Sequence, residues 1–190
     1  MPRVGLVSST VTAAAADVAD EIGLSQLSMS LVAERLGVKA PSLYKHVNGL
    51  ADLTHRIAAL GAVELGDALR DAMQGLAGRD ALAAAAQTVR TYVKEHPGRY
   101  AATTGASPTG TDDPLAVALD RTLESFAAVL RAYRLDPGEQ IHAMRMLRSI
   151  LHGFATLESS NGFQLDADID DSFTWMITFV DRGLTAAGAP

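Results

Sequence analysis

Residues 31–53 read LVAERLGVKAPSLYKHVNGLADL, and this stretch decides how the N-terminal part of the chain folds. Counted from Met29, Ala33 is the fifth residue, Gly37 the ninth and Leu43 the fifteenth. A helix-turn-helix needs a small residue where its helices cross, a glycine in the turn and an apolar anchor on the second helix. The three residues meet these needs, so the spacing predicts a helix-turn-helix over residues 29–47.

The second helix of this motif, expected over residues 40–46, carries side chains that suit a DNA surface. Leu43 and Val47 are expected to face inward and to turn the polar residues outward. Those outward residues, with Lys39 at the entry, are Ser42, Tyr44, Lys45 and His46. Their donors suit phosphates, while Ala40 and Pro41 suit contact with a thymine methyl group in the major groove. The alternative is a solvated helix face without a ligand.

Composition limits the classes to which the protein can belong. The chain has 190 residues, 48% of them hydrophobic, and a net charge of −6. The absence of cysteine excludes disulfides, thiolate zinc sites and cysteine nucleophiles. No apolar run reaches the roughly 18 residues of a membrane span, and the first residues lack a secretory signal. We therefore expect a cytoplasmic protein without a membrane partner, whose basic surface is local and not general.

Helix signals dominate the sequence, and sustained alternation of β-branched residues is missing, so we predict an all-α fold. About nine helices are expected, near residues 9–23, 29–36, 40–46, 49–76, 79–95, 97–103, 113–133, 137–160 and 168–187. Residues 1–47 would form a three-helix DNA-binding domain that contains the helix-turn-helix. Residues 48–190 would form a helical bundle for ligand sensing and dimerisation.

The last two expected helices are apolar on more than one side. Over residues 137–160, a stripe from Ile141 to Phe154 repeats every three or four residues, and Met146, Ile150 and Leu157 extend the apolar surface to an adjacent face. The helix over 168–187 adds Trp175 and Phe179 beside its own stripe. A helix buried on two sides needs a second neighbour, so we expect a homodimer through these helices. The alternative is that both faces pack inside one bundle.

A ligand pocket in the C-terminal region is harder to place. Side chains that could line it are Tyr92, Tyr100, Phe126, Tyr133, Met144, Arg148, His152 and Trp175. Aromatic and methionine residues at helical spacing also fit an ordinary core. Arg148 and His152 share a helix face and would orient an anionic or polar ligand, or else pair with Glu158 or a subunit partner. Gly153, in mid-helix, suggests the close approach of another helix or of a ligand.

Enzyme signals are weak. Residues 139–142 read EQIH, a single Glu-x-x-His, whereas a di-iron site in a bundle needs two such motifs. The chain has no G-x-S-x-G, no H-E-x-x-H and no Rossmann glycine pattern. We expect no catalytic residues, no metal and no cofactor.

The segment LGVKAPSLYKHV, residues 36–47, resembles the signature of the tetracycline-repressor (TetR) family of one-component transcription regulators. HPGRYAAT (96–103) and RSILHGFATLE (148–158) are similar to a subclass with a Trp-His-Gly motif in its sensor domain, with Leu151 at the tryptophan position. The resemblance implies a homodimer whose helix-turn-helix segments enter successive major grooves. It also implies that Ser42, Tyr44 and His46 hold phosphates, that Lys39, Ala40 and Pro41 approach bases, and that Lys45 approaches bases or phosphate. It further implies that Ser30 lies where relatives reach a base and that Arg3 belongs to an N-terminal arm.

The resulting hypothesis is a repressor that binds a palindromic DNA operator as a homodimer and leaves it when a small-molecule effector binds. Two other classes stay open. The first is a helical module that binds a protein partner through residues 28–56. The second is a ligand-binding bundle, or an enzyme, that does not bind DNA.

Overall fold

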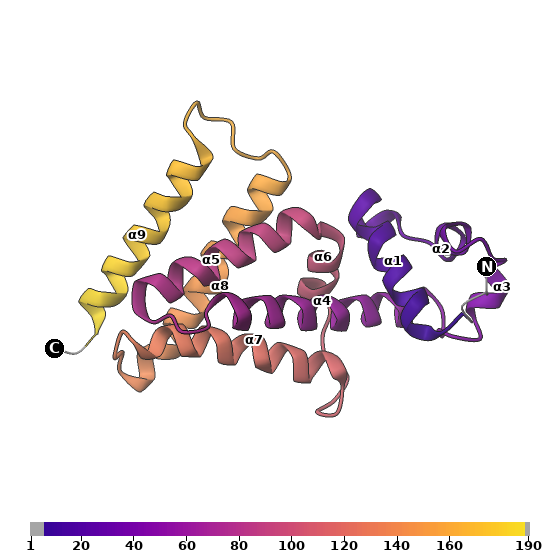
Figure 1. Ribbon diagram of the computed structural model, residues 1–190, viewed down its shortest axis with the longest axis horizontal. Helices are drawn as coiled ribbons and strands as arrows, with labels where there is room; N and C mark the ends of the chain where they lie inside the picture. The colour runs from indigo at the N-terminus through magenta and orange to yellow at the C-terminus, as the bar shows by residue number, and fades with distance from the viewer. Residues whose placement is uncertain (1–5, 189–190) are drawn as a thin grey trace. The chain divides into compact units, whose positions relative to one another are not determined.

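The computed structural model describes residues 6–188, and Arg3 lies outside this range. Its helices are α1 (Ser8–Ile22), the 3-10 turn η1 (Leu24–Gln26), α2 (Met29–Arg35), α3 (Ala40–Leu43), α4 (Leu50–Ala72), α5 (Gly78–Glu95), α6 (Pro97–Gly105), α7 (Pro114–Arg131), α8 (Pro137–Ser159) and α9 (Ile169–Ala187) (Figure 1). Over the described residues the fold has nine α-helices and no strand. The all-α prediction is confirmed.

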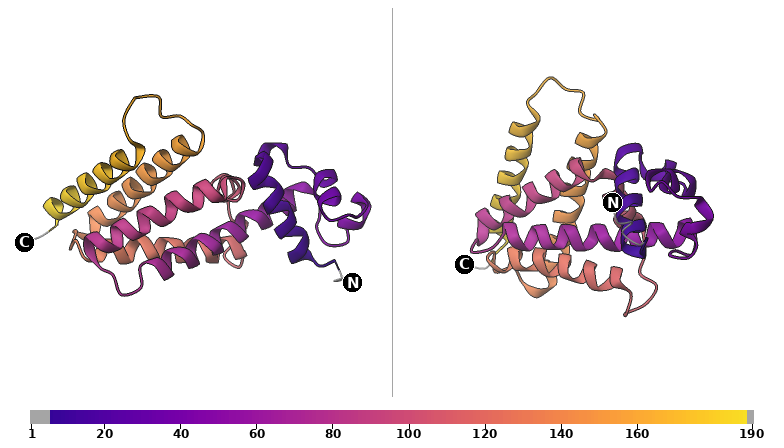
Figure 2. Two further views of the ribbon diagram at one scale, coloured as in Figure 1. Left: turned by 45° about the horizontal axis from the view of Figure 1, so that its top comes forward. Right: turned by 45° about the vertical axis from the view of Figure 1, so that its right-hand side comes forward.

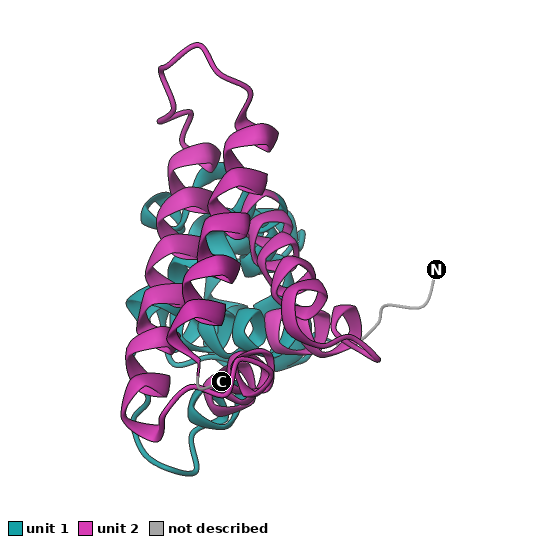
Figure 3. Ribbon diagram, turned by 90° about the vertical axis from the view of Figure 1, so that its left-hand side faces the viewer, with its two compact units in different colours: residues 1–64, 95–118 teal, residues 65–94, 119–190 magenta. Residues whose placement is uncertain are grey.

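The chain forms two compact units (Figure 3). Unit 1 combines residues 1–64 with residues 95–118, and unit 2 combines residues 65–94 with residues 119–190. Helix α6 and the start of α7 therefore pack with the N-terminal helices, although they lie far along the chain. The boundary expected between residues 47 and 48 separates two functions, not two compact units, and it stays a prediction.

In unit 1 the core forms around the helix-turn-helix. Val32 and Leu43 are fully buried, and Val47 is 2% exposed, so the second helix faces the core as the periodicity predicts. Val11 and Ala15 of α1 are also fully buried. Each buried aliphatic side chain of this size contributes about 1.5–3 kcal/mol relative to an exposed one. The packing of α1, α2 and α3 therefore makes the outer surface of the motif rigid.

In unit 2, helices α8 and α9 lie side by side and are joined at one end by a loop (Figure 2). One face of each helix is buried, and Leu147 and Ile177 are central to it. The second apolar face of each helix is exposed, with Trp175 at 68% and Phe179 at 65%. The expectation of two apolar faces is confirmed. Ile141, which we expected in the buried stripe, is 53% exposed instead, whereas Ala143 in the same part of α8 is buried.

Two helix ends differ from expectation. Helix α3 ends at Leu43 and continues as a turn, in which the amides of His46 and Val47 both donate to the carbonyl of Leu43. At the start of α4, Asn48 is a residue type that can cap a helix with its side chain. In the structure its backbone takes part instead, because the amide of Asn48 donates to the carboxylate of Asp52 at 2.7 Å.

Candidate nucleic-acid interface

The helix-turn-helix begins at a capped helix and turns at a glycine. The hydroxyl of Ser28 accepts a hydrogen bond from the amide of Leu31, which satisfies one of the free amides at the start of α2. Gly37 follows α2 with φ of 65°, a conformation that glycine adopts at no steric cost. The amide of Val38 then donates to the carbonyl of Ala33 at 3.0 Å and closes the turn. Lys39 is therefore the residue that immediately precedes α3, at its N-cap position.

The expected DNA-contacting side chains lie mostly on the outside. Tyr44 is 58% exposed. The other exposed members of the set are Ser30, Lys39, Pro41 and Lys45. The half-buried members are Ala40, Ser42 and His46. Leu43, between them, is fully buried, so the exposed and buried positions alternate as an amphipathic helix requires.

Charge on this surface is concentrated in two lysines. Within residues 6–188, neither Lys39 nor Lys45 forms an ion pair with a carboxylate. Arg35, the other basic residue of the motif, is bound to Glu21 of α1 through both guanidinium nitrogens. A phosphate can thus be neutralised by the two lysines without breaking an ion pair inside the protein.

Two contacts fix this surface to α1. The hydroxyl of Ser8 donates to the carbonyl of His46 at 2.9 Å, and the Arg35–Glu21 pair joins α2 to α1. The His46 carbonyl lies at the end of the turn after α3, so the contact holds the outer segment at its far end. A rigid surface loses less conformational entropy when it binds.

The side chains that the sequence suggests for a ligand pocket have different environments. Tyr92, Tyr100, Phe126 and Tyr133 are buried, whereas Met144 is half-buried and Arg148 and His152 are exposed. Tyr100 belongs to unit 1 and the others to unit 2. Burial raises the pKa of Tyr133, and the hydroxyl adds to this effect by donating to Asp181 at 2.7 Å. A position in the core accounts for the four aromatic residues.

An open apolar groove of about 570 Å³ lies between α8 and α9 in unit 2. Trp175 lines it, and it is the one member of the expected ligand set that does so. Met146, Ile150 and Phe179 line it too, while Glu139 and His142 supply its polar rim. The Glu139–His142 spacing that resembles half of a di-iron motif therefore lies at an open surface. The described residues contain no group of three or more His, Cys, Asp or Glu that could hold a metal ion.

The structure contains a buried ion cluster in unit 2 that the sequence analysis missed. The guanidinium of Arg90 donates to both carboxylate oxygens of Glu158, at 2.6 and 2.7 Å, and pairs with Asp170 at 2.6 Å. The rings of Phe154 and Phe173 lie 5.6 and 4.6 Å from the guanidinium carbon. Hydrogen bonds from Arg90, more than any other contact, lower the pKa of Glu158. Arg90 thereby connects α5, α8 and α9.

Sequence comparisons agree with the helix-turn-helix geometry. Residues 11–53 match the family "Bacterial regulatory proteins, tetR family", and residues 82–180 match "Tetracyclin repressor-like, C-terminal domain". The chain belongs to the TetR family. It is 31% identical to the uncharacterized HTH-type transcriptional regulator YobS of Bacillus subtilis over 96% of this chain and 95% of that protein. It is 36% identical to the uncharacterized HTH-type transcriptional regulator Rv0681 of Mycobacterium tuberculosis over 87% of this chain and 75% of that protein.

Solved structures share the fold of this TetR-family chain at lower sequence identity. A protein of unknown function from Rhodococcus sp. RHA1 has a TM-score of 0.80 and 22% identity, over 96% of this chain and 97% of that one. BioQ with its double-stranded DNA operator has a TM-score of 0.71 and 21% identity, over 95% and 99%. TetR-Q116A from Acinetobacter baumannii AYE in complex with minocycline has a TM-score of 0.72 and 22% identity, over 97% and 99%.

The protein is therefore a TetR-family transcriptional regulator and not an enzyme, in agreement with the prediction. Members of this family bind double-stranded DNA operators and small-molecule ligands, typically as dimers. Among the described residues, no helix is both long enough and apolar enough to cross a membrane.

Proposed function

We propose that this chain is a repressor that binds a palindromic DNA operator as a homodimer and leaves it when a small molecule binds in unit 2. DNA binding is supported by two exposed lysines beside Tyr44, Lys39 and Lys45, which form no ion pair with a carboxylate of residues 6–188. They lie on a segment whose inner side chains are buried. The bound operator in the structure of BioQ and the bound minocycline in that of TetR-Q116A support both halves by analogy.

The DNA surface assigned here consists of Ser30, Lys39, Ala40, Pro41, Ser42, Tyr44, Lys45 and His46. Lys39→Ala and Tyr44→Ala should each weaken operator binding by about 1–3 kcal/mol per contact. Lys39→Ala should also reduce the salt slope, which is the slope of the logarithm of the binding constant against the logarithm of the salt concentration, by about one. The reason is that Lys39 brings a positive charge close to the DNA phosphates and so releases a counterion on binding. Fluorescence anisotropy over a range of salt concentrations measures the affinity. The probe is a DNA duplex that the wild-type protein has selected from a pool of random sequences.

Arg70→Ala is the matched control, because it also removes one exposed positive charge and Arg70 lies in the last turn of α4. Its affinity and salt slope should equal those of the wild type. If Lys39→Ala and Tyr44→Ala both leave affinity and slope unchanged, residues 39–46 do not form the DNA surface.

We assign dimerisation to the exposed apolar faces of α8 and α9. Trp175 and Phe179 stack with ring centroids 5.4 Å apart and project from α9 beside the apolar groove. Two copies related by a twofold axis would each cover the groove of the other, which would produce a four-helix interface. A side chain at Gly153 would meet nothing within 4 Å among the described residues, so the close approach that the sequence suggests at this position is not observed within the chain.

Phe179→Asp should convert the dimer to a monomer, with a dissociation constant at least about 30-fold higher, because each interface would contain two buried carboxylates. Light scattering coupled to size exclusion at several concentrations measures this change. Leu123→Asp on α7, where leucine is 44% exposed, is the matched control and should remain dimeric. A dimeric Phe179→Asp variant would place the interface elsewhere.

A further inference from the structure

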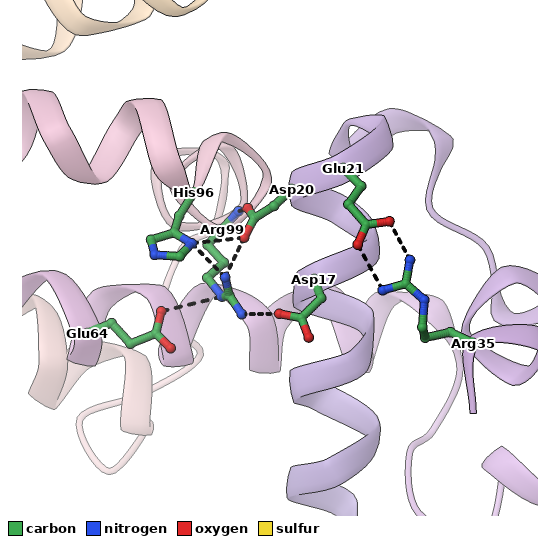
Figure 4. Close-up of polar contacts among 7 residues, drawn as sticks. All are labelled: Asp17, Asp20, Glu21, Arg35, Glu64, His96 and Arg99. Carbon is green, nitrogen blue, oxygen red and sulfur yellow. Dashed lines mark hydrogen bonds and ion pairs between the residues drawn. The ribbon is translucent and has the colours of Figure 1, made fainter.

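A cluster of charged side chains at the start of α6 joins α6 to α1 and α4 within unit 1 (Figure 4). We call it the Arg99 joint, and its members are Asp17, Asp20, Glu64, His96 and Arg99. One terminal nitrogen of Arg99 donates to Asp20, and the other donates to Asp17 at 2.6 Å. The Nε atom lies 3.4 Å from a carboxylate oxygen of Glu64. The backbone amide of Arg99 adds a bond of 2.9 Å to Asp20.

The Arg99 joint differs from an ordinary surface ion pair in its burial. The side chains of Arg99 and Asp20 are each 10% exposed, whereas the Arg35–Glu21 pair on the other side of α1 is 38% and 57% exposed. Breaking a buried pair leaves a desolvated charge, whereas an exposed pair contributes little. The Arg99 joint is therefore a connection that resists separation of α6 from α1.

Backbone packing at two glycines reinforces the same connection. A Cβ atom on Gly98 would overlap the carbonyl group of Ala19 and lie 2.6 Å from the amide nitrogen of Asp20. On α4, a Cβ atom on Gly61 would lie 2.8 Å from the hydroxyl of Thr103 and 3.1 Å from the carbonyl oxygen of Arg99. Helix α6 thus touches α1 at one glycine and α4 at another, with the Arg99 guanidinium between them.

The chain sequence gives α6 a second connection. Helix α5, which lies in unit 2 up to Lys94, ends at Glu95, and α6 begins at Pro97. A single residue, His96, therefore separates the two helices, and its ring lies in the Arg99 joint with Nδ1 2.7 Å from an Arg99 nitrogen. A displacement of α5 would act on the joint through one residue and reach α1, which carries the Ser8 and Glu21 contacts to the helix-turn-helix.

We propose that Arg99 is a positioning residue for operator binding, which fixes α1 to α6 and thereby couples the DNA surface to the sensor unit. This inference rests on the proposed function, since a coupling requires both a DNA site and a sensor site. The proposed route runs from α5 through His96 and α6 to α1.

Hydrogen exchange of the wild-type protein, with and without the selected operator duplex, tests this proposal. Operator binding should slow exchange of the amides of residues 99–105 in α6, although these residues lie outside the helix-turn-helix. Arg99→Gln should abolish that protection and weaken operator binding about 5- to 150-fold, the usual range of a coupling between sites. The control Arg70→Gln breaks an exposed pair with Asp67, which lies outside this route, and should keep the protection of α6.

Asp17→Ala serves if Arg99→Gln does not fold, because Asp17 is 53% exposed and its loss removes one arm of the joint without burying a charge. It should reduce the protection of α6. A wild-type protein that binds the duplex without protecting α6 would overturn the Arg99 proposal alone. A wild-type protein that binds no duplex from the pool would overturn the proposed function and this inference with it.

Discussion

Arg90→Met is expected to lower the free energy of unfolding by about 3–5 kcal/mol, the usual cost of removing one partner from a buried ion pair. The side chains of Arg90 and Glu158 are only 6% and 8% exposed. Without the guanidinium, the carboxylate of Glu158 keeps Lys94 at 2.9 Å, but the Lys94 side chain is 51% exposed and its charge is better solvated. Two-state urea unfolding at neutral pH measures the change.

The effect of Arg90→Met should depend on pH in a fixed direction. Arg90 lowers the pKa of Glu158 in the folded state, so the pair stabilises the fold above the pKa of the unfolded carboxyl and loses this effect as pH falls through the folded-state pKa. The difference between wild type and variant should therefore shrink below about pH 4.3, the ordinary pKa of glutamate.

Two further variants separate charge from packing at Arg90. Arg70→Met removes an exposed pair with Asp67, whose side chains are 62% and 47% exposed, and should change stability by less than about 0.5 kcal/mol. The double variant Arg90→Met with Glu158→Leu should recover a large part of the loss, since no charge is left buried without a partner. A single Arg90→Met variant as stable as the wild type would show that the cluster is solvated.

The sequence predicts the helices well because each depends on a local pattern. The expected helix over 137–160 is observed at Pro137–Ser159, and the expected helix over 168–187 is observed at Ile169–Ala187. Proline at the first turn of α8 and α6 marks a helix start that needs no distant partner. The exposure of Tyr44 beside buried Leu43 also follows from the period of a helix.

The ion clusters could not be predicted, because their partners are distant in the sequence. Arg90 and Glu158 are 68 residues apart, and Arg99 and Asp20 are 79 residues apart. No periodicity relates such positions, and a charged residue on an amphipathic helix usually faces solvent. The candidate ligand residues could not be assigned for a different reason, which is that their residue types fit two kinds of environment. Aromatic side chains are suited equally to a core and to a pocket, and only the fold shows that Trp175 is exposed while Tyr92 is buried.

Gly98→Ala is expected to destabilise the protein by about 3 kcal/mol, at the upper end of the range for overpacking. The added methyl group would overlap the carbonyl carbon and oxygen of Ala19, which are backbone atoms of α1 and cannot rotate away. The two helices would have to separate, and the bonds from Arg99 to Asp20 would lengthen or break as a result. Thermal and urea unfolding measure the loss, and exchange of the α6 amides locates it.

Gly105→Ala is the matched control for Gly98→Ala because it makes the same change in the same helix, where the new methyl group meets nothing within 4 Å. Alanine has the higher helix propensity, so Gly105→Ala should be neutral or stabilising by up to about 1 kcal/mol. Opposite signs at the two positions would separate the steric effect of Ala19 from helix propensity. A neutral Gly98→Ala would mean that α1 and α6 are not held in contact, and Arg99 could then not position the helix-turn-helix through α1.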